Sequence, residues 1–370
     1  MPVRSPDDAD LLLPSGAILV HVGPFKTGSS SLQMALHTRR DEVLGLGVHY
    51  PGPAYRHLRP IAAVMGRGPR GVPSVPAEEW DELVADIRRV DAPRTVVSSE
   101  GLSTAGTKTV ARVVHDLGAD RVHVVRVERR LDRLLPSAWQ ERVKSSNETR
   151  SYDRFLDDVL SADPTGSQDK TASFWAAHSL ERFLGRWQPV LPDDHIHVVV
   201  ADEGNPRATS GVFERLLGLP EGMLDPMQRP NSSMTWERVE LCRRLNEVFD
   251  ERGWPDRLRR RLLQGAIVNG LREAPPSPFD VRIPPVSGDH LRRTAELSSG
   301  RIELLRTGGF DVIGDPEATR VPADGGPGSD AEAAPEVPSS IAIEAVVGAV
   351  EELLADGRRT SGKRSKRAQA

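Results

Sequence analysis

The sequence predicts an α/β fold in which a central parallel sheet carries helices on both faces. Short apolar, β-branched segments alternate along the chain with segments of helical periodicity, which is the order that βαβ units produce. The apolar segments are nearly continuous, as in strands that are covered on both faces. A glycine-rich turn joins the first of these strands to a helix. The length of 370 residues is enough for one sizeable domain of this kind.

The clearest strand is 17–22, an Ala-Ile-Leu-Val-His-Val run between Gly16 and Gly23. Further strands share its apolar, β-branched character and are predicted over 44–50, 94–99, 120–128 and 195–201. His21 and His123 lie inside two of these strands, so we expect them to be packed rather than catalytic.

Helices are predicted where apolar residues recur three and four positions apart. The segments are 78–90, with Trp80, Leu83, Val84 and Ile87 on one face, 107–117, which ends at Gly118, and also 181–187 and 235–250. The stretches 145–180 and 265–290 are rich in turn formers and charges. We expect these two stretches to cover the crevice at the edge of the sheet and to select the acceptor.

The turn after the first strand reads as a cradle for a phosphate or sulfate group. Its residues are Gly23-Pro24-Phe25-Lys26-Thr27-Gly28-Ser29-Ser30-Ser31-Leu32. A strand-to-helix turn directs backbone N–H groups and the positive end of the helix at one point, which favours an anion. Lys26 and the hydroxyls of Thr27, Ser29, Ser30 and Ser31 add side-chain donors. A purely structural turn would need neither the lysine nor the hydroxyls.

The order of residues in this loop differs from a Walker A motif, G-x-x-x-x-G-K-[ST]. Gly23 and Gly28 keep the frame, but Ser29 stands where the lysine belongs, and the basic residue is Lys26, inside the loop. A lysine there could lie beside a 5′-phosphate and the bridging oxygen of a smaller leaving group. The loop therefore disfavours a triphosphate with magnesium.

The segment resembles the 5′-phosphosulfate loop of the sulfotransferases that use 3′-phosphoadenosine 5′-phosphosulfate (PAPS), whose pattern is P-K-T-G-[ST]-[ST]-[ST]-L. The chain departs from this pattern at Phe25, where proline is commoner. The resemblance implies a P-loop-like three-layer fold, PAPS as donor substrate and no metal. It also implies that Lys26 acts on the leaving group and that the donor is bound by Gly23, Lys26, Thr27, Gly28, Ser29, Ser30 and Ser31.

A second motif follows the strand predicted over 120–128. Arg129 comes just after it and Ser137 eight residues later, inside a helix for which Asp132 is a plausible N-cap and whose first turn would hold Pro136. In the sulfotransferases an arginine and a serine at this spacing bind the 3′-phosphate of the donor, which implies that role here. A guanidinium fork suits phosphate oxygens. The neighbouring Arg130 and Arg133 leave the register open by a residue.

A carboxylate and a histidine are the candidate bases. Glu100 ends the strand predicted over 94–99, and ligands of open α/β sheets bind beyond such strand ends. In several carbohydrate-directed sulfotransferases a glutamate deprotonates the acceptor hydroxyl, and Glu100 resembles it; a cap or first-turn acid is the alternative. His57 is an alternative base or, with Arg59, an acceptor contact, unless it is merely solvated. Resemblance to bacterial members extends over about 16–314, including 213–220 and 231–233.

Composition excludes several classes of protein. The net charge of -4 and a pI near 6.2 argue against general nucleic-acid binding, and the basic run 257–261 is expected on a solvated helix face. The single cysteine, Cys242, rules out an intramolecular disulfide framework and is expected to pack on a helix. No segment has the roughly 20 apolar residues of a bilayer span or the pattern of a signal peptide. We therefore expect a cytoplasmic enzyme.

The expected organisation has five parts. They are a flexible N-terminus over 1–15, a sulfotransferase domain over 16–320, a disordered linker over 321–340, an amphipathic helix over 341–356 and a basic flexible tail over 357–370. The apolar face of the helix would comprise Ile343, Val346, Val347, Val350 and Leu354.

The function predicted from these residues is transfer of a sulfuryl group from PAPS to a hydroxyl of a small-molecule or glycan acceptor, for instance a carbohydrate or glycolipid. Two other functions stay open. One is a kinase-like P-loop phosphotransferase that binds Mg²⁺·ATP, against which the misplaced lysine counts. The other is a nucleotide sensor that binds adenosine 3′,5′-bisphosphate without turnover.

Overall fold

The computed structural model of the chain describes residues 3–66, 75–145, 148–166, 172–205, 207–225, 233–276, 280–323 and 335–349. The chain forms two compact units, each assembled from separate stretches. The first comprises Met1–Leu134, Asp158–Arg229 and Asp289–Gly325, and the second Leu135–Asp157, Pro230–Gly288 and Gly326–Ala370. The single domain expected over 16–320 spans parts of both units.

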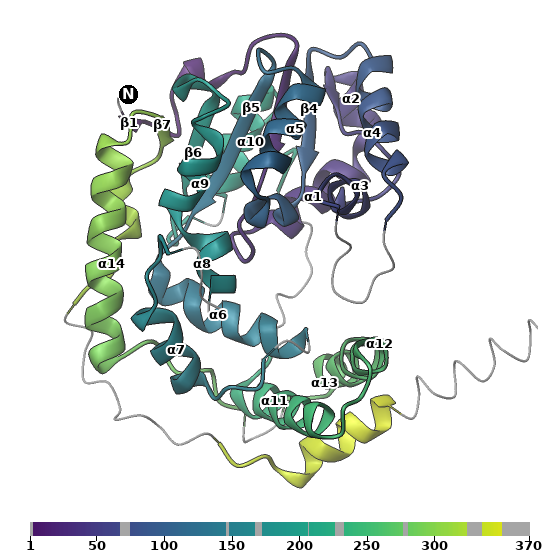
Figure 1. The fold of residues 1–370 in the computed structure, drawn as a ribbon, viewed down its shortest axis with the longest axis vertical. Helices are drawn as coiled ribbons and strands as arrows, with labels where there is room; N and C mark the ends of the chain where they lie inside the picture. The colour runs from purple at the N-terminus through teal and green to yellow at the C-terminus, as the bar shows by residue number, and fades with distance from the viewer. Residues whose placement is uncertain are drawn as a thin grey trace, which may run out of the picture. The chain divides into compact units, whose positions relative to one another are not determined.

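A parallel sheet is the framework of the first unit (Figure 1). Within the described residues it has seven strands in the order β1-β7-β6-β5-β2-β4-β3, and every neighbouring pair is parallel. The strands are β1 (Val3–Arg4), β2 (Ala17–His21), β3 (Val48–His49), β4 (Arg94–Ser98), β5 (Val122–Glu128), β6 (Ile196–Val200) and β7 (Asp311–Ile313).

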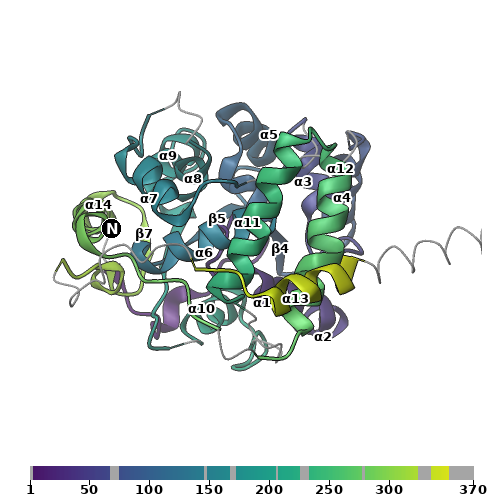
Figure 2. The same ribbon diagram turned by 90° about the horizontal axis from the view of Figure 1, so that it is seen from below.

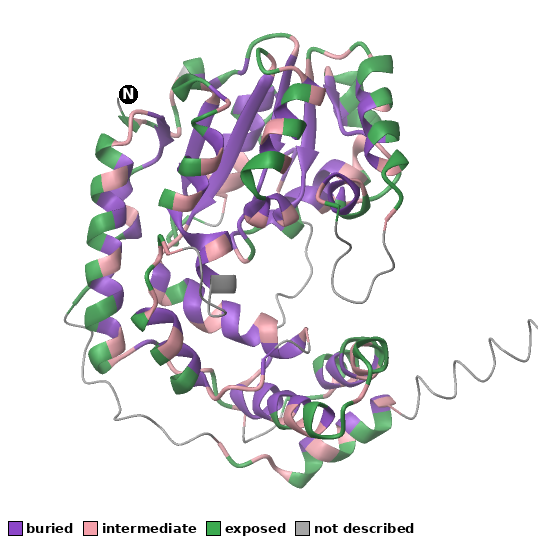
Figure 3. Ribbon diagram, viewed as in Figure 1, coloured by how far each residue is buried: buried purple, intermediate pink, exposed green. Residues whose placement is uncertain are grey.

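Two hydrophobic cores, one on each face of the sheet, make the three layers. Successive residues of β2 enter different cores: Ile18 and Val20 belong to one, and Ala17 and Leu19 to the other. The first core includes side chains of α4, α5 and α9, and the second includes side chains of α1 and α10. The central strands are buried on both faces (Figure 3). The predicted three-layer α/β fold with a central parallel sheet is therefore confirmed.

The helices of the first unit join or follow these strands. They are α1 (Ser29–Thr38), α2 (Arg40–Gly45), α3 (Leu58–Val64), α4 (Glu78–Arg89), α5 (Thr107–Leu117), α8 (Ala172–His178), α9 (Leu180–Trp187), α10 (Ala208–Leu217) and α14 (Gly288–Thr307), with 3₁₀ turns η1 (Ala9–Leu11), η2 (Glu100–Thr104), η3 (Asp193–His195) and η5 (Pro316–Thr319). α6 (Leu131–Lys144) and α7 (Tyr152–Ser161) pass from one unit to the other.

Most of the predicted elements are confirmed. The strands over 17–22, 94–99, 120–128 and 195–201 and the helices over 78–90, 107–117 and 181–187 form within two residues of their expected ends. Trp80, Leu83, Val84 and Ile87 are buried together on α4, as predicted. Burial of His21 and His123 in β2 and β5 agrees with a packing role.

Three stretches differ in detail from the pattern read from the sequence. The strand predicted over 44–50 forms only over Val48–His49, because Arg40–Gly45 is helical. The stretch 145–180 holds α7 and α8, and 265–290 holds the helix α13 (Val268–Glu273).

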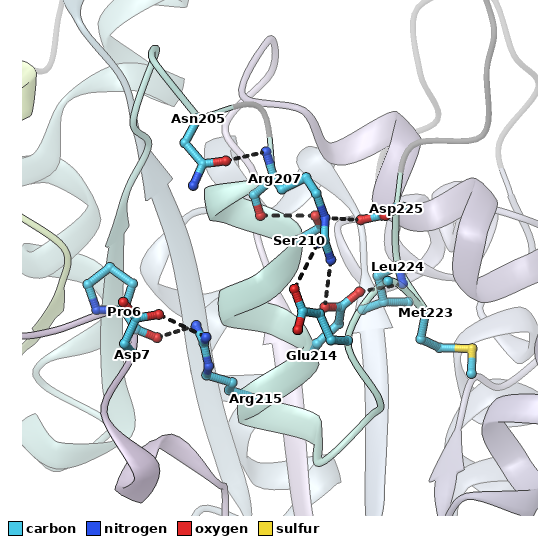
Figure 4. A network of polar contacts seen from close by, with 12 residues as sticks. Pro6, Asp7, Asn205, Arg207, Ser210, Glu214, Arg215, Met223, Leu224 and Asp225 are labelled. Atoms are coloured by element: carbon cyan, nitrogen blue, oxygen red, sulfur yellow. Dashed lines mark hydrogen bonds and ion pairs between the residues drawn. The ribbon is translucent and has the colours of Figure 1, made fainter.

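The N-terminal segment, expected to be flexible, instead packs on the first unit. Val3 and Arg4 pair with Val312 and Ile313 of β7, and Leu11 and Leu13 are buried. Arg215 of α10 donates to the carbonyl of Pro6 and forms an ion pair with Asp7 (Figure 4). The edge of the sheet is thereby covered by the chain's own N-terminal residues.

Polar contacts fix the loop after α10 to that helix (Figure 4). The buried carboxylate of Glu214 accepts a hydrogen bond of 2.7 Å from the backbone N–H of Leu224 and lies 3.5 Å from a guanidinium nitrogen of Arg207. Arg207 also donates to Asp225 at 2.5 Å. This segment, 213–220 with its following loop, thus has a structural role, and residues 231 and 232 lie outside the described part.

The second unit consists of helices in its described residues. They are α11 (Trp236–Glu251), α12 (Asp256–Arg260), the π-helix η4 (Arg261–Ile267), α13 and a helix over 339–349 that crosses α13 (Figures 1 and 2). The helices predicted over 235–250 and around 257–261 are confirmed. Cys242 is buried on α11, and burial raises the pKa of its thiol to about 12.

The helix over 339–349 packs through a different face from the apolar face predicted from the sequence. Ile341 and Ala345 are buried, whereas Ile343, Val346 and Val347 are exposed. A Cβ built on Gly270 of α13 would lie 3.2 Å from the Cα of Gly348, so the two backbones meet without side chains between them. Val350 and Leu354, residues 324–334 of the linker and the tail 357–370 lie outside the described residues. Within the described part of the chain, no helix has the length and apolar character of a membrane span.

Candidate functional site

The three predicted elements of the first unit meet at the carboxyl edge of its sheet. The glycine-rich loop follows β2, Glu100 follows β4 and Arg129 follows β5. In the sheet β2 lies between β4 and β5, and all three run parallel. The chain connections diverge from β2 at this point, which is where ligands bind in open α/β sheets.

Hydrogen bonds to β5 set the position of the loop. The N–H of Val22 donates to the carbonyl of Val125 at 3.0 Å, and the N–H of Val127 donates to the carbonyl of Gly23 at 2.9 Å. Beyond this point the backbone turns through positive φ angles at Gly23 (83°), Lys26 (71°) and Gly28 (94°). A positive φ is energetically costly for a residue with a side chain. The backbone conformation at Lys26 therefore marks this loop as a candidate functional segment.

The side chains of the loop divide into two groups. The buried hydroxyl of Thr27 donates to the carbonyl of Pro24 at 2.7 Å and braces the loop from within. Ser29 begins α1 and is buried, and its hydroxyl has no hydrogen-bond partner among the described residues. Ser30 and Ser31 are exposed and Lys26 is half-buried. A buried hydroxyl without a partner at a helix N-terminus is a group that an anionic oxygen would satisfy.

Arg129 is the arginine that contacts the loop. Its Nη1 donates to the carbonyl oxygen of Lys26 at 3.1 Å. Arg130 instead makes two hydrogen bonds, of 3.0 and 2.8 Å, to Asp132, and the side chain of Arg133 is 57% exposed. Of the three arginines, Arg129 is thus the one with a hydrogen bond to the loop among the described residues.

The fork of Arg129 also holds a carboxylate that the sequence analysis missed. Glu203 follows β6 and accepts from Nε of Arg129 at 2.5 Å and from Nη2 at 3.0 Å. The hydrogen bonds from Arg129 lower the pKa of Glu203. A carboxylate has the planar, bidentate geometry that a phosphate also offers, so Glu203 occupies the donors that an anionic ligand would need. An acid just after the strand neighbouring β5 was the signal available in the sequence.

Ser137 lies on α6, in the part of the chain that belongs to the second unit. The helix begins at Leu131, so Asp132 is in its first turn rather than at its N-cap, and Pro136 is the sixth helical residue rather than one of the first turn. Ser137 is half-buried. Its role at a 3′-phosphate stays a prediction.

Glu100 lies against the loop. It is the first residue of η2 and is 8% exposed. A Cβ built on Gly23 would be 3.1 Å from the Cγ of Glu100, so the backbone of the loop packs directly on this side chain. Only glycine fits at position 23, because its φ is positive and Glu100 fills the space.

A buried polar network surrounds the Glu100 carboxylate. Nε2 of Gln33, on α1, lies 3.3 Å from Oε2 of Glu100 and 3.0 Å from Oγ of Ser98. The same Ser98 hydroxyl is 2.9 Å from Nδ1 of His21. Burial lowers the pKa of His21 to about 3, so this imidazole is neutral at pH 7.

His57 has a structural role instead of the acceptor contact or base expected from the sequence. It is 2% exposed, its Nδ1 accepts from the N–H of Ser98 at 3.0 Å, and its Nε2 is 2.9 Å from the carbonyl of Pro51. Both ring nitrogens are thus used by the backbone, and burial lowers the pKa of the ring to about 4. Arg59 points to solvent and pairs with Glu79 of α4.

Buried charges brace β5 behind the site. The guanidinium of Arg126 is fully buried, bonds to Glu128 and donates to the carbonyl of Ala177 at 3.0 Å. Glu128 also lies 2.9 Å from a guanidinium nitrogen of Arg301 on α14. The strand end that carries Arg129 is therefore tied to two other elements of the first unit, a constraint that no local pattern in the sequence revealed.

In comparisons with known proteins, no family model and no curated protein matches this sequence. Among the described residues, no cluster of three or more histidine, cysteine or acidic side chains is placed to hold a metal ion. The residues of the site combine hydrogen-bond donors that suit a phosphate, a guanidinium fork and a buried carboxylate at one edge of a sheet.

Proposed function

We propose that the protein is a sulfotransferase that moves the sulfuryl group of PAPS to an acceptor hydroxyl. The observation that carries the proposal is the hydrogen bond from Arg129 to the carbonyl of Lys26. It brings together two motifs that the sequence assigned to opposite ends of one doubly charged nucleotide. The unpartnered hydroxyl of Ser29 at the start of α1 supports an anion at the loop.

Each residue has a distinct role in the proposed reaction. The loop N–H groups with Ser29, Ser30 and Ser31 would hold the 5′-phosphosulfate, and Lys26 would neutralise charge on the phosphate oxygen as the sulfur–oxygen bond to it breaks. Arg129 would hold the 3′-phosphate. Glu100 would take the proton from the acceptor hydroxyl as its oxygen forms the new bond to sulfur, a contribution of typically ~10²–10⁴-fold.

The position of Glu100 favours transfer over a sensor that only binds nucleotide. Its carboxylate is packed on the backbone of Gly23, next to the loop, and is held by a buried hydrogen bond from Gln33. A binding module has no need of a carboxylate beside an anion site, because it repels the ligand. The proposed enzyme needs one to activate the acceptor.

A thermal-shift experiment tests the donor. Adenosine 3′,5′-bisphosphate should raise the melting temperature of the wild type, and at a hundredfold excess over Kd the gain is about 2.7 kcal/mol. Lys26→Ala and Arg129→Ala should lose this gain. The control is Arg133→Ala, since this neighbouring arginine is 57% exposed and its Nε lies 3.9 Å from a carboxylate oxygen of Asp132. Stabilisation by Mg²⁺·ATP but not by the bisphosphate would overturn the proposal.

A second experiment separates catalysis from binding. Glu100→Gln should keep the response to the bisphosphate but lose sulfuryl transfer from PAPS to a panel of hydroxyl acceptors. Full turnover by this variant would remove Glu100 from the mechanism. Binding of the bisphosphate without any turnover by the wild type, over a broad acceptor panel, would favour the sensor.

A further inference from the structure

We propose that Gln33 is a positioning residue that holds the Glu100 carboxylate against the glycine-rich loop. The inference rests on the proposed function, in which Glu100 is the base. Gln33 is the fifth residue of α1, the helix that the loop opens, and it is fully buried. Its Nε2 reaches both Oε2 of Glu100, at 3.3 Å, and Oγ of Ser98, at 3.0 Å.

Gln33 donates both of these hydrogen bonds through its NH₂ group. One N–H goes to the Glu100 carboxyl and the other to the Ser98 hydroxyl, and that hydroxyl oxygen lies 2.9 Å from Nδ1 of His21. The two hydrogens of one NH₂ group thus join the carboxylate of Glu100 to the end of β4.

This arrangement couples the two halves of the proposed reaction. α1 presents its N-terminus to the donor, and the same helix carries the amide that bonds to the base. On the opposite side the backbone of Gly23 packs on Glu100. The carboxylate is therefore confined between two parts of the donor-binding segment, which fixes its distance from the loop.

The test replaces Gln33 by methionine, which has nearly the same length but no donor. The readouts are kcat for sulfuryl transfer and the affinity for adenosine 3′,5′-bisphosphate, both measured on the full chain. Gln33→Met should lower kcat about tenfold and leave the affinity unchanged, because the lost hydrogen bond orients the base and not the donor. Gln33→Glu, which also lacks the NH₂ donor, should lower kcat as well. A wild-type kcat in both variants would overturn the inference.

Ser103→Ala is the matched control. The Ser103 hydroxyl is buried and donates to the backbone carbonyl of Glu100 at 2.7 Å, so its loss perturbs the same turn without touching the carboxylate. The control should keep the kcat of the wild type. An equal fall of kcat in Ser103→Ala would mean that Gln33→Met acts by loosening η2, and would also overturn the inference.

A double variant tests whether Gln33 acts through Glu100. Gln33→Met combined with Glu100→Gln should have the same residual kcat as Glu100→Gln alone, because residues that act as a unit are not additive. A further loss in the double variant defeats the role of Gln33 while leaving the proposed function intact. A wild type that neither binds adenosine 3′,5′-bisphosphate nor turns over defeats the proposed function, whatever the variants show.

Discussion

The guanidinium of Arg129 donates a hydrogen bond to the backbone carbonyl of Lys26, and the two atoms are 3.1 Å apart. The residues are 103 positions apart in the sequence and follow different strands, β2 and β5. Both are placed by the backbone of the sheet, because the loop itself is bonded to β5 through Gly23 and Val127. The two residues are therefore held at the same edge of the sheet, although they come from distant parts of the sequence.

Replacing Arg129 by lysine should weaken binding of adenosine 3′,5′-bisphosphate by roughly ten- to a hundredfold. Lysine keeps the charge but loses the planar fork and the bond to the Lys26 carbonyl. Isothermal titration calorimetry measures the change. Arg133→Lys, at an exposed neighbour, should bind as the wild type does, and an Arg129→Lys affinity equal to that of the wild type would contradict the bidentate role.

Glu203→Gln should bind the bisphosphate more tightly than the wild type. The carboxylate of Glu203 competes for the Arg129 fork, and an amide competes less strongly. The pH dependence has a definite sign: Arg129 lowers the pKa of Glu203, so the ion pair is intact above the usual glutamate range and is lost as pH falls through the lowered value.

Affinity of the wild type relative to Glu203→Gln should therefore differ most near neutral pH and converge in acid. Asp202→Asn, one residue earlier in the same turn, is the control. Weaker binding by Glu203→Gln would show that Glu203 helps to orient Arg129 rather than competing with the ligand.

Two glycines of the loop should respond differently to alanine. Both have positive φ, 83° at Gly23 and 94° at Gly28, so each substitution should cost about 1–2 kcal/mol of backbone strain. At Gly23 the new Cβ also meets Glu100 at 3.1 Å, whereas at Gly28 it meets nothing within 4 Å. Gly23→Ala should therefore lose more stability in urea unfolding. Equal losses in the two variants would mean that Glu100 does not pack on the loop.

Buried histidines should make the free energy of unfolding fall as the pH is lowered from about 6.5 to 4. Burial lowers the pKa of His57 to about 4 and that of His21 to about 3, while both titrate near 6.5 in the unfolded chain. In that window the unfolded state binds more protons, so stability rises with pH. Each histidine contributes a slope of up to about 1.4 kcal/mol per pH unit.

His57→Gln removes one of these slopes. Urea unfolding at about pH 7, 6 and 5 should show a shallower decline for this variant than for the wild type. Its stability at pH 7 should be lower by roughly 1–3 kcal/mol, because the N–H of Ser98 and the carbonyl of Pro51 lose a matched partner. An unchanged slope would contradict the burial of a neutral imidazole at this position.

The parts of the fold that follow from local pattern were predictable. The continuous apolar runs gave β2, β4, β5 and β6, and the spacing of Trp80, Leu83, Val84 and Ile87 gave α4. α7 was missed although Tyr152, Phe155, Leu156, Val159 and Leu160 follow helical spacing and are all buried. Its serines and aspartates indicated turns and charged surface instead of a helix. β1 and β7 have two and three residues, too few for any period to be read.

The same distinction holds for the candidate site. The loop and Arg129 were predictable because each follows a recognisable strand. Gln33, Glu203 and the buried Arg126–Glu128 pair were not, because their contacts depend on which strands become neighbours in the sheet. His57 illustrates the opposite error: its loop position indicated solvent exposure, but tertiary packing buries it against Ser98.

The backbone contact between Gly270 and Gly348 bears on how shortened forms of this protein should be made. A recombinant fragment that ends at residue 320, as the sequence suggested, would lack the helix over 339–349. Peptide groups and apolar side chains of α13 would then be exposed to solvent, and such a fragment would tend to aggregate. Preparations for crystallisation or assay should therefore keep the chain at least through residue 349.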